Sequence, residues 1–274
     1  MSNLYEICYL IMIGTASAAA FATGGSTLQM LFGIPYWVCT LIIAAFIFVI
    51  ALFGTSVVRK CASTLSVLIL IGLVLVLVPN IIVQWDAITA AISNLVSGKM
   101  PVISGESGAF GPALYSAVLY FFFQLASVSV MYQHMEDVTD VKQINKAAIW
   151  MFICNFLAME LSIFGLLAIA YVAELATASV PMLVLVQNGV GAGILSILII
   201  LGAISTAVNM ISGIVTRCVN AMERRMDSKE KKAKGHLARN AVFTAIFTFL
   251  AFAIAQFGLM TVVKKGYAYL GYAA

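Results

Sequence analysis

Charge is what this chain has least of. Of its 274 residues, 9% are charged, whereas a soluble domain has about 25%. It has only two histidines, and its five cysteines form no CxxC pair and no cluster with histidine. No HExxH sequence, nucleophile–base pair or pair of carboxylates within one apolar stretch occurs. These absences exclude a soluble domain, and they predict no bound metal, no cofactor and no enzymatic activity.

Apolar residues make up 63% of the chain. A helix needs about 20 consecutive apolar residues to cross a bilayer. Seven stretches qualify: 5–31, 36–54, 62–83, 113–132, 147–172, 190–220 and 238–258. The sequence therefore predicts an all-α, polytopic membrane protein with about seven transmembrane helices in one transmembrane domain, residues 1–274, whose first partner is the lipid bilayer.

The basic residues between these stretches are distributed unevenly. If successive stretches alternate in direction, three lysines lie on one side, Lys99, Lys264 and Lys265, and twelve basic residues lie on the other: Arg59, Lys60, Lys142, Lys146, Arg217, Arg224, Arg225, Lys229, Lys231, Lys232, Lys234 and Arg239. The positive-inside rule then places the N-terminus in the cytoplasm and the C-terminus outside, in the plasma or inner membrane. This rule explains the basic segment at 224–234, so we expect no nucleic-acid partner.

The first stretch is made of small residues. Between Gly14 and Thr27 only Phe21 is larger than threonine. Positions four apart share one helix face, so Gly14, Ala18, Ala22 and Ser26 form a row, with a second row beside it at Thr15, Ala19, Thr23 and Thr27. Small residues at this spacing let helix backbones approach closely. The row predicts a packing helix at the centre of a bundle, or a helix kept thin to leave room for a solute.

The sixth stretch carries a polar stripe. At 100° per residue, seven residues fall on about a third of the helix surface: Gly202, Ser205, Thr206, Asn209, Ser212, Gly213 and Thr216. Such a stripe is unfavourable against lipid, so it faces protein or water. It indicates either helix packing or the lining of a pathway, with Ser205, Thr206 and Asn209 as candidate ion ligands.

Two further polar positions lie deep in apolar stretches. Gln124 is near the middle of the fourth stretch and shares a face with Tyr120 and Ser127, which makes these three candidate substrate contacts. Glu160 is the only carboxylate deep inside a stretch. An intramembrane carboxylate is a candidate proton relay. For both positions, a hydrogen bond between packed helices is the structural alternative.

The glycine- and proline-containing segment 98–112 divides the chain into residues 1–97, with three stretches, and 112–274, with four. A shorter apolar run at 179–188 cannot span a membrane, and it predicts a re-entrant or surface helix on the outer side. GTASA at 14–18 and GAISTA at 202–207 are weakly similar. Because five stretches separate them, the two run in opposite directions, as an inverted repeat requires.

Residues 11–60, IMIGTASAAAFATGGSTLQMLFGIPYWVCTLIIAAFIFVIALFGTSVVRK, resemble the third and fourth helices of the YkvI-type membrane proteins. That family belongs to the amino acid–polyamine–organocation superfamily and has the LeuT-like fold. GPALYSAVLYFFFQ resembles its sixth helix, AISTAVNMISGIVTR its eighth, and GLMTVVKKGYAYLGY the start of its tenth.

The resemblance implies two inverted five-helix repeats and alternating access around a midplane site. It implies that Tyr120, Gln124 and Ser127 flank the substrate and that Ser205 and Thr206 are the hydroxyl pair of an ion site. In this alignment the first two helices of the pattern are absent. Residues 1–97 are then the remainder of the first repeat, and 112–274 the second repeat up to the start of its fifth helix.

We therefore expect a truncated secondary transporter of an amino acid or similar small organic solute, coupled to Na⁺ or H⁺. Two alternatives share the fold. One is a membrane receptor that binds such a solute without transporting it. The other is a structural subunit that associates with another chain supplying the missing helices.

Overall fold

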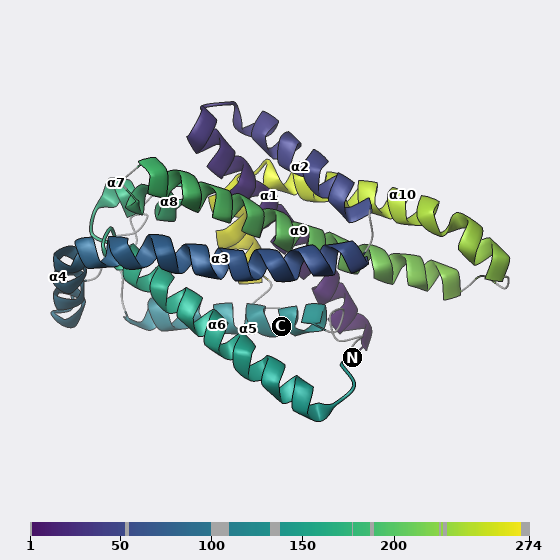
Figure 1. Cartoon of the computed structure of the whole chain (residues 1–274), viewed down its shortest axis with the longest axis horizontal. Helices are drawn as coiled ribbons and strands as arrows, with labels where there is room; N and C mark the ends of the chain where they lie inside the picture. The colour runs from purple at the N-terminus through teal and green to yellow at the C-terminus, as the bar shows by residue number, and fades with distance from the viewer. Residues whose placement is uncertain are drawn as a thin grey trace. The chain divides into compact units, whose positions relative to one another are not determined.

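The computed structural model describes the backbone of residues 2–52, 55–99, 110–131, 138–176, 178–186, 189–224, 226 and 229–269, and within these ranges it contains helices and no strands. Figure 1 shows the helices along the chain. The long helices are α1 (Ser2–Phe32), α2 (Tyr36–Leu52), α3 (Thr55–Val83), α5 (Phe110–Met131), α6 (Val141–Leu167), α9 (Gly189–Arg224) and α10 (Lys229–Ala255). The short ones are α4 (Trp85–Val96), α7 (Ala173–Ala176), α8 (Pro181–Leu185), α11 (Leu259–Thr261) and the π-helix η2 (Val262–Tyr267).

Five helices of the described part are long and apolar enough to cross a membrane: Tyr9–Phe32, Thr64–Val83, Val141–Leu167, Gly189–Arg224 and Gly235–Ala255. The other two predicted spans are also helices, α2 with 17 residues and α5 with 22. The all-helical fold class is confirmed, and the long apolar helices are compatible with an integral membrane protein.

The chain forms two compact units. Unit 1 comprises residues 1–65, 118–135 and 200–274. Its core is one cluster of side chains from α1, α2, α5, α10 and the second half of α9. The largest side chains that it buries almost completely include Tyr9, Phe21, Ile47 and Ile211.

α1 and α2 pack closely because glycines of α1 face α2. A Cβ atom on Gly24 would lie 3.1 Å from Ile43 Cδ1, and one on Gly25 would overlap the Thr40 methyl group. α1 ends at Gly33, which has a φ of 65°, and glycine adopts this left-handed conformation without steric cost. The chain then reverses at once into α2, so the two helices run antiparallel.

Unit 2 comprises residues 66–117 and 136–199. Its core is smaller and centres on Leu77, Ile169 and Leu185. Gly165 of α6 lies against Leu185, because a Cβ atom there would approach Leu185 Cδ2 to 2.8 Å. The side chain of Gln84 donates a hydrogen bond of 3.0 Å to the Leu185 carbonyl. These contacts bring α8 and the end of α3 together.

The polar segments contain more helix than the sequence predicts. α4 lies in the polar segment after the third span, and it buries Ile88 and Ala91 on one face. α10 begins at Lys229, within the basic segment. The short apolar run at 179–188 forms α8, which Pro181 begins and which buries Leu183 and Leu185 in unit 2.

Candidate functional site

The small-residue helix α1 is the most enclosed of the five candidate spans. In the row predicted for packing, Ala18 and Ala22 are completely buried, Ser26 is 5% exposed and Gly14 is half-buried. In the neighbouring row, the hydroxyls of Thr15, Thr23 and Thr27 donate to the carbonyls four residues earlier. These hydroxyls are satisfied within the helix, so α1 packs through small, hydrogen-bonded side chains.

The segment after α10 returns along α1 as a further helical segment that contains a π-helical turn. Gly258, with a φ of 86°, turns the chain, and α11 and η2 follow. Val262 packs against Ala18 and Ala19, and Gly266 lies so close to Thr15 that a Cβ atom would overlap its methyl group. Figure 1 shows this segment in yellow beyond the end of α10.

This return segment lies beside the middle of a membrane helix, because Ala18 and Ala19 are near the midpoint of the apolar stretch Tyr9–Phe32. π-Helical turns inside helices are frequent at functional sites. No sequence pattern predicts the π-helix, although the resemblance places the start of a helix at Gly258.

An aromatic and amide cluster connects the return segment to α5. The ring of Tyr267 stacks on Phe123 with centroids 4.2 Å apart, and Tyr120 lies 6.2 Å from Phe123. Gln124 Nε2 donates a hydrogen bond of 2.5 Å to the Tyr120 hydroxyl. The structure thus brings the predicted Tyr120 and Gln124 together and adds two aromatic walls. Phe123 and Tyr267 were missed, because no local pattern shows a stacking between α5 and η2.

Both predicted side chains of this cluster are accessible. Tyr120 is 43% exposed, and Gln124 is also exposed. A primary amide carries two donor hydrogens and an acceptor oxygen, so Gln124 can bond to more than one partner. The third predicted contact, the Ser127 side chain, lies outside the described residues. The exposed pair can therefore offer a hydroxyl and an amide to a polar solute.

The three candidate ion ligands of α9 flank its core-facing side. Ser205 and Asn209 are half-buried and Thr206 is exposed, while Ala207 and Val208 beside them are buried. None of the hydrogen bonds described joins these three side chains to Gln124 or Tyr120. These three members of the polar stripe therefore lie along the edge of the helix–helix contact, whereas Ser212 and Gly213 are buried.

Glu160 lies in unit 2, on α6, where it is half-buried. None of the most apolar 18 residues of this helix is buried, and the neighbours Phe156, Leu157 and Ile163 are all at least 41% exposed. The aromatic and amide cluster belongs to unit 1. The predicted proton relay and the cluster thus belong to different compact units.

An apolar cavity of about 400 Å³ lies in unit 1 between α1, α9 and α10. Gly14, Thr15 and Ser17 of α1 line it, so the thin part of α1 borders open space as well as packed helices. Ser17 is 1% exposed, and its hydroxyl has no hydrogen-bond partner among the described residues. A polar ligand in the cavity could satisfy this buried hydroxyl.

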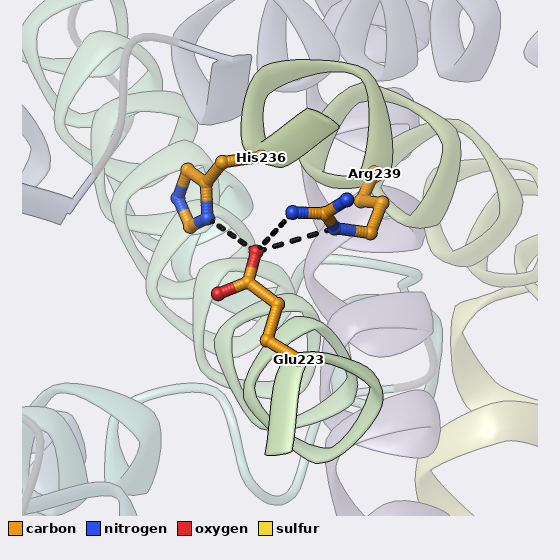
Figure 2. A network of polar contacts seen from close by, with 3 residues as sticks. All are labelled: Glu223, His236 and Arg239. Atoms are coloured by element: carbon orange, nitrogen blue, oxygen red, sulfur yellow. Dashed lines mark hydrogen bonds and ion pairs between the residues drawn. The ribbon is translucent and has the colours of Figure 1, made fainter. Parts of the chain in front are cut away.

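A polar network ties the end of α9 to α10, as Figure 2 shows. Glu223 Oε1 accepts from Arg239 Nη2 at 2.6 Å and from Nε at 3.2 Å, and it lies 2.9 Å from His236 Nδ1. Glu223 follows the apolar stretch 190–220. The hydrogen bonds from Arg239 and then His236 hold the pKa of this carboxyl below its usual range. The sequence did not single out this network, because its members stand 13 and 16 residues apart.

No group of three or more histidine, cysteine or acidic side chains that could hold a metal ion occurs within the described ranges. No protein-family model matches the chain, and neither a curated protein nor a solved structure matches it.

Proposed function

We propose that the protein is a secondary transporter of an amino acid or similar small organic solute, built on a partial LeuT-like arrangement of about seven membrane helices. The observation that carries the proposal is the return segment of unit 1. α10 and the return segment form a discontinuous helix with its break at Gly258; the π-helical turn of the return segment lies beside the midpoint of α1, and Tyr267 stacks on Phe123 of α5. Transporters place discontinuous helices at the membrane midplane, where their exposed backbone groups bind substrate and ions.

In this proposal the solute binds at the aromatic and amide cluster. Gln124 and Tyr120 supply an amide and a hydroxyl, Ser127 is the third polar contact, and the stacked rings of Phe123 and Tyr267 form an apolar wall. A site with a few polar groups among aromatic side chains is typical for small organic ligands. Gly14, Ala18, Ala22 and Ser26 keep α1 thin, so that the return segment can lie close to it.

The coupling ion has two candidate sites. The oxygens of Ser205, Thr206 and Asn209 are hard ligands of the kind that Na⁺ accepts. Glu160 carries the only carboxyl in the middle of a long apolar helix among the side chains described, and such groups act as proton relays. Na⁺ coupling would make uptake depend on the α9 residues, and H⁺ coupling would make it depend on Glu160.

Uptake by the purified full chain in proteoliposomes tests the proposal. The probe is a mixture of radiolabelled amino acids, driven by an inward Na⁺ gradient or by a pH gradient. We expect uptake by the wild type and at least a tenfold loss in Gln124→Ala, since the lost amide leaves its polar partners unpaired. Gln29→Ala is the matched control, because Gln29 is exposed on α1 and has no role in the proposed site.

Ion variants then identify the coupling. Loss of Na⁺ stimulation in Thr206→Ala with unchanged pH dependence would assign Na⁺, whereas Glu160→Gln abolishing the pH dependence would assign H⁺. Amino-acid binding to the purified protein together with no uptake under either gradient would overturn transport and favour a receptor. If the protein shows no amino-acid binding and no uptake, the proposed solute site is wrong.

A further inference from the structure

A second, polar cavity of about 170 Å³ lies in unit 1 between α2, α9 and α10. Its lining includes one hydroxyl-bearing pair on α9, Ser212 and Thr216, two amides, Asn220 and Asn240, and the imidazole of His236. Ser212, Thr216 and Asn220 follow each other at four-residue spacing, as His236 and Asn240 do on α10, so each set shares one helix face. The cavity is therefore lined on two sides by polar donors and acceptors.

One buried hydroxyl in this cavity has no hydrogen-bond partner among the described residues. Ser212 is 8% exposed, and its Oγ bonds to none of them. The Thr216 hydroxyl already donates to the Ser212 carbonyl at 2.7 Å, so it does not satisfy that Oγ. Buried hydroxyls nearly always have a partner. The orphaned Ser212 hydroxyl thus indicates a ligand that brings hydroxyl groups or water into the cavity.

The charges around the cavity select against a cation. Glu223 is the described carboxylate closest in sequence to the lining residues of α9, and Arg239 and His236 both bond to it. Among the described side chains of residues 217–239, the three arginines Arg217, Arg224 and Arg239 outnumber the one carboxylate, Glu223. This excess of positive charge favours an anion beside the cavity, while the lining itself recognises uncharged hydroxyl groups.

The depth of the cavity matches the lipid headgroups. The buried apolar residues of α9 include Ile211, Ile214 and Val215, and the first charged residue of the helix is Arg217. The lining residues from Ser212 to Asn220 therefore cross from the apolar part of the helix into its charged end. The headgroup region lies directly outside the hydrocarbon core, and juxtamembrane basic segments attract anionic lipids.

We propose that this cavity binds the polyol phosphate headgroup of an anionic phospholipid of the phosphatidylglycerol type. The glycerol hydroxyls bond to Ser212, Asn220 and Asn240, and the phosphate lies at the mouth, at the charged end of α9. A cavity of about 170 Å³ has the volume of about five to six waters in the liquid at about 30 Å³ each. That is enough for a three-carbon polyol. The proposal does not rest on transport.

Lipid binding to the purified full chain tests the proposal directly. Native mass spectrometry would compare phosphatidylglycerol with phosphatidylpropanol of the same acyl chains. Both lipids carry one negative charge and a three-carbon headgroup, but phosphatidylpropanol has no headgroup hydroxyl. We expect phosphatidylglycerol to bind about tenfold more tightly, since two or three net hydrogen bonds distinguish the two lipids. Equal binding would mean attraction by charge alone and would overturn the proposal.

The double variant Asn220→Ala/Asn240→Ala should lose this tenfold preference and keep its binding of phosphatidylpropanol, which serves as the control for folding. Asn155→Ala, a matched change at an exposed asparagine of α6, should keep the preference. A preference that survives the double variant would overturn the site. If soluble sn-glycerol 3-phosphate at equal concentration displaced phosphatidylglycerol, the cavity would bind a free polyol phosphate by the same contacts. That result would overturn the lipid as the ligand.

Discussion

α1 of unit 1 and α6 of unit 2 are both apolar helices long enough to cross a membrane, yet they are packed in opposite ways. In the most apolar 18 residues of each, 72% of α1 is buried and none of α6. α6 is nevertheless the more hydrophobic of the two. Hydrophobicity therefore does not decide which helix is enclosed.

Side-chain size explains the difference. The enclosed stretch of α1 consists mainly of glycine, alanine, serine and threonine, whereas α6 presents Trp150, Phe152 and Phe156, each at least 55% exposed. Lipid tails are as apolar as leucine, so burying a large apolar side chain gains little free energy between membrane helices. Close backbone approach gains dispersion energy instead, and small residues permit it.

The largest expected effect comes from adding bulk at the enclosed helix. Ala18 is completely buried against Val262, so Ala18→Leu should destabilise the protein by about 3 kcal/mol through overpacking. Ala147→Leu makes the same change on the exposed α6 and should shift stability by less than about 0.5 kcal/mol. Reversible unfolding in mixed micelles measures both. Similar losses in the two variants would mean that α6 is enclosed as well.

Replacing a glycine by alanine should change stability by less, and in opposite directions in the two units. A Cβ atom on Gly25 would overlap the Thr40 methyl and lie 3.3 Å from Thr40 Cα, whereas one on Gly193 meets nothing within 4 Å. Gly25→Ala should therefore cost about 1–2 kcal/mol, and Gly193→Ala should stabilise by about 0.5 kcal/mol through helix propensity. The same unfolding assay measures the stability of both variants. A stabilising Gly25→Ala would contradict the close approach of α1 and α2.

Each unit contains a tyrosine whose hydroxyl donates a hydrogen bond to a backbone carbonyl. The Tyr36 hydroxyl donates to the carbonyl of Ala255 at the end of α10, at 2.7 Å and partly buried. Tyr171 donates to the Lys99 carbonyl at 2.6 Å in an exposed position. Tyr36→Phe should lower the unfolding free energy by about 1 kcal/mol, because it removes a partly buried hydrogen bond and leaves the Ala255 carbonyl only its described bond from the Gly258 amide. Tyr171→Phe should cost less than half as much, since water replaces its bond.

The hydropathy of the sequence predicted the long helices well, because a membrane span is a local property of about 20 residues. All seven predicted stretches lie largely on helices, and five of these helices are long and apolar enough to cross a membrane. The ends differ by up to nine residues where a polar segment continues the helix, as at Lys229. α4 was missed because its helix depends on the packing of Ile88 and Ala91 in unit 2. The predicted repeats, 1–97 and 112–274, are not tested by the fold and stay a prediction.

The candidate site was predictable only where its residues share one helix. Tyr120 and Gln124 stand four apart on α5, so helical periodicity alone places them on one face. Phe123 and Tyr267 meet because the chain turns back at Gly258 and packs against α1, which no local pattern encodes. The roles of Ser205, Thr206, Asn209 and Glu160 stay predictions for the same reason: their function depends on partners from other parts of the bundle.

The smallest effect on stability at neutral pH is expected from substituting Glu223. This residue lies at the charged end of unit 1, where α9 and α10 leave the apolar region. The pKa of Glu223 is lowered in the folded protein, first by Arg239 and then by His236. A lowered carboxyl pKa adds stability above its unfolded value of about 4.3, and this stability disappears as the pH falls through the folded pKa. The melting temperature of Glu223→Gln should therefore fall less than that of the wild type between about pH 6 and pH 3.

His236→Gln should keep most of the pH dependence of the melting temperature, because Arg239 lowers the pKa of Glu223 more than His236 does. A wild-type slope in Glu223→Gln would show that other carboxyls produce the acid sensitivity and that the network is held by packing.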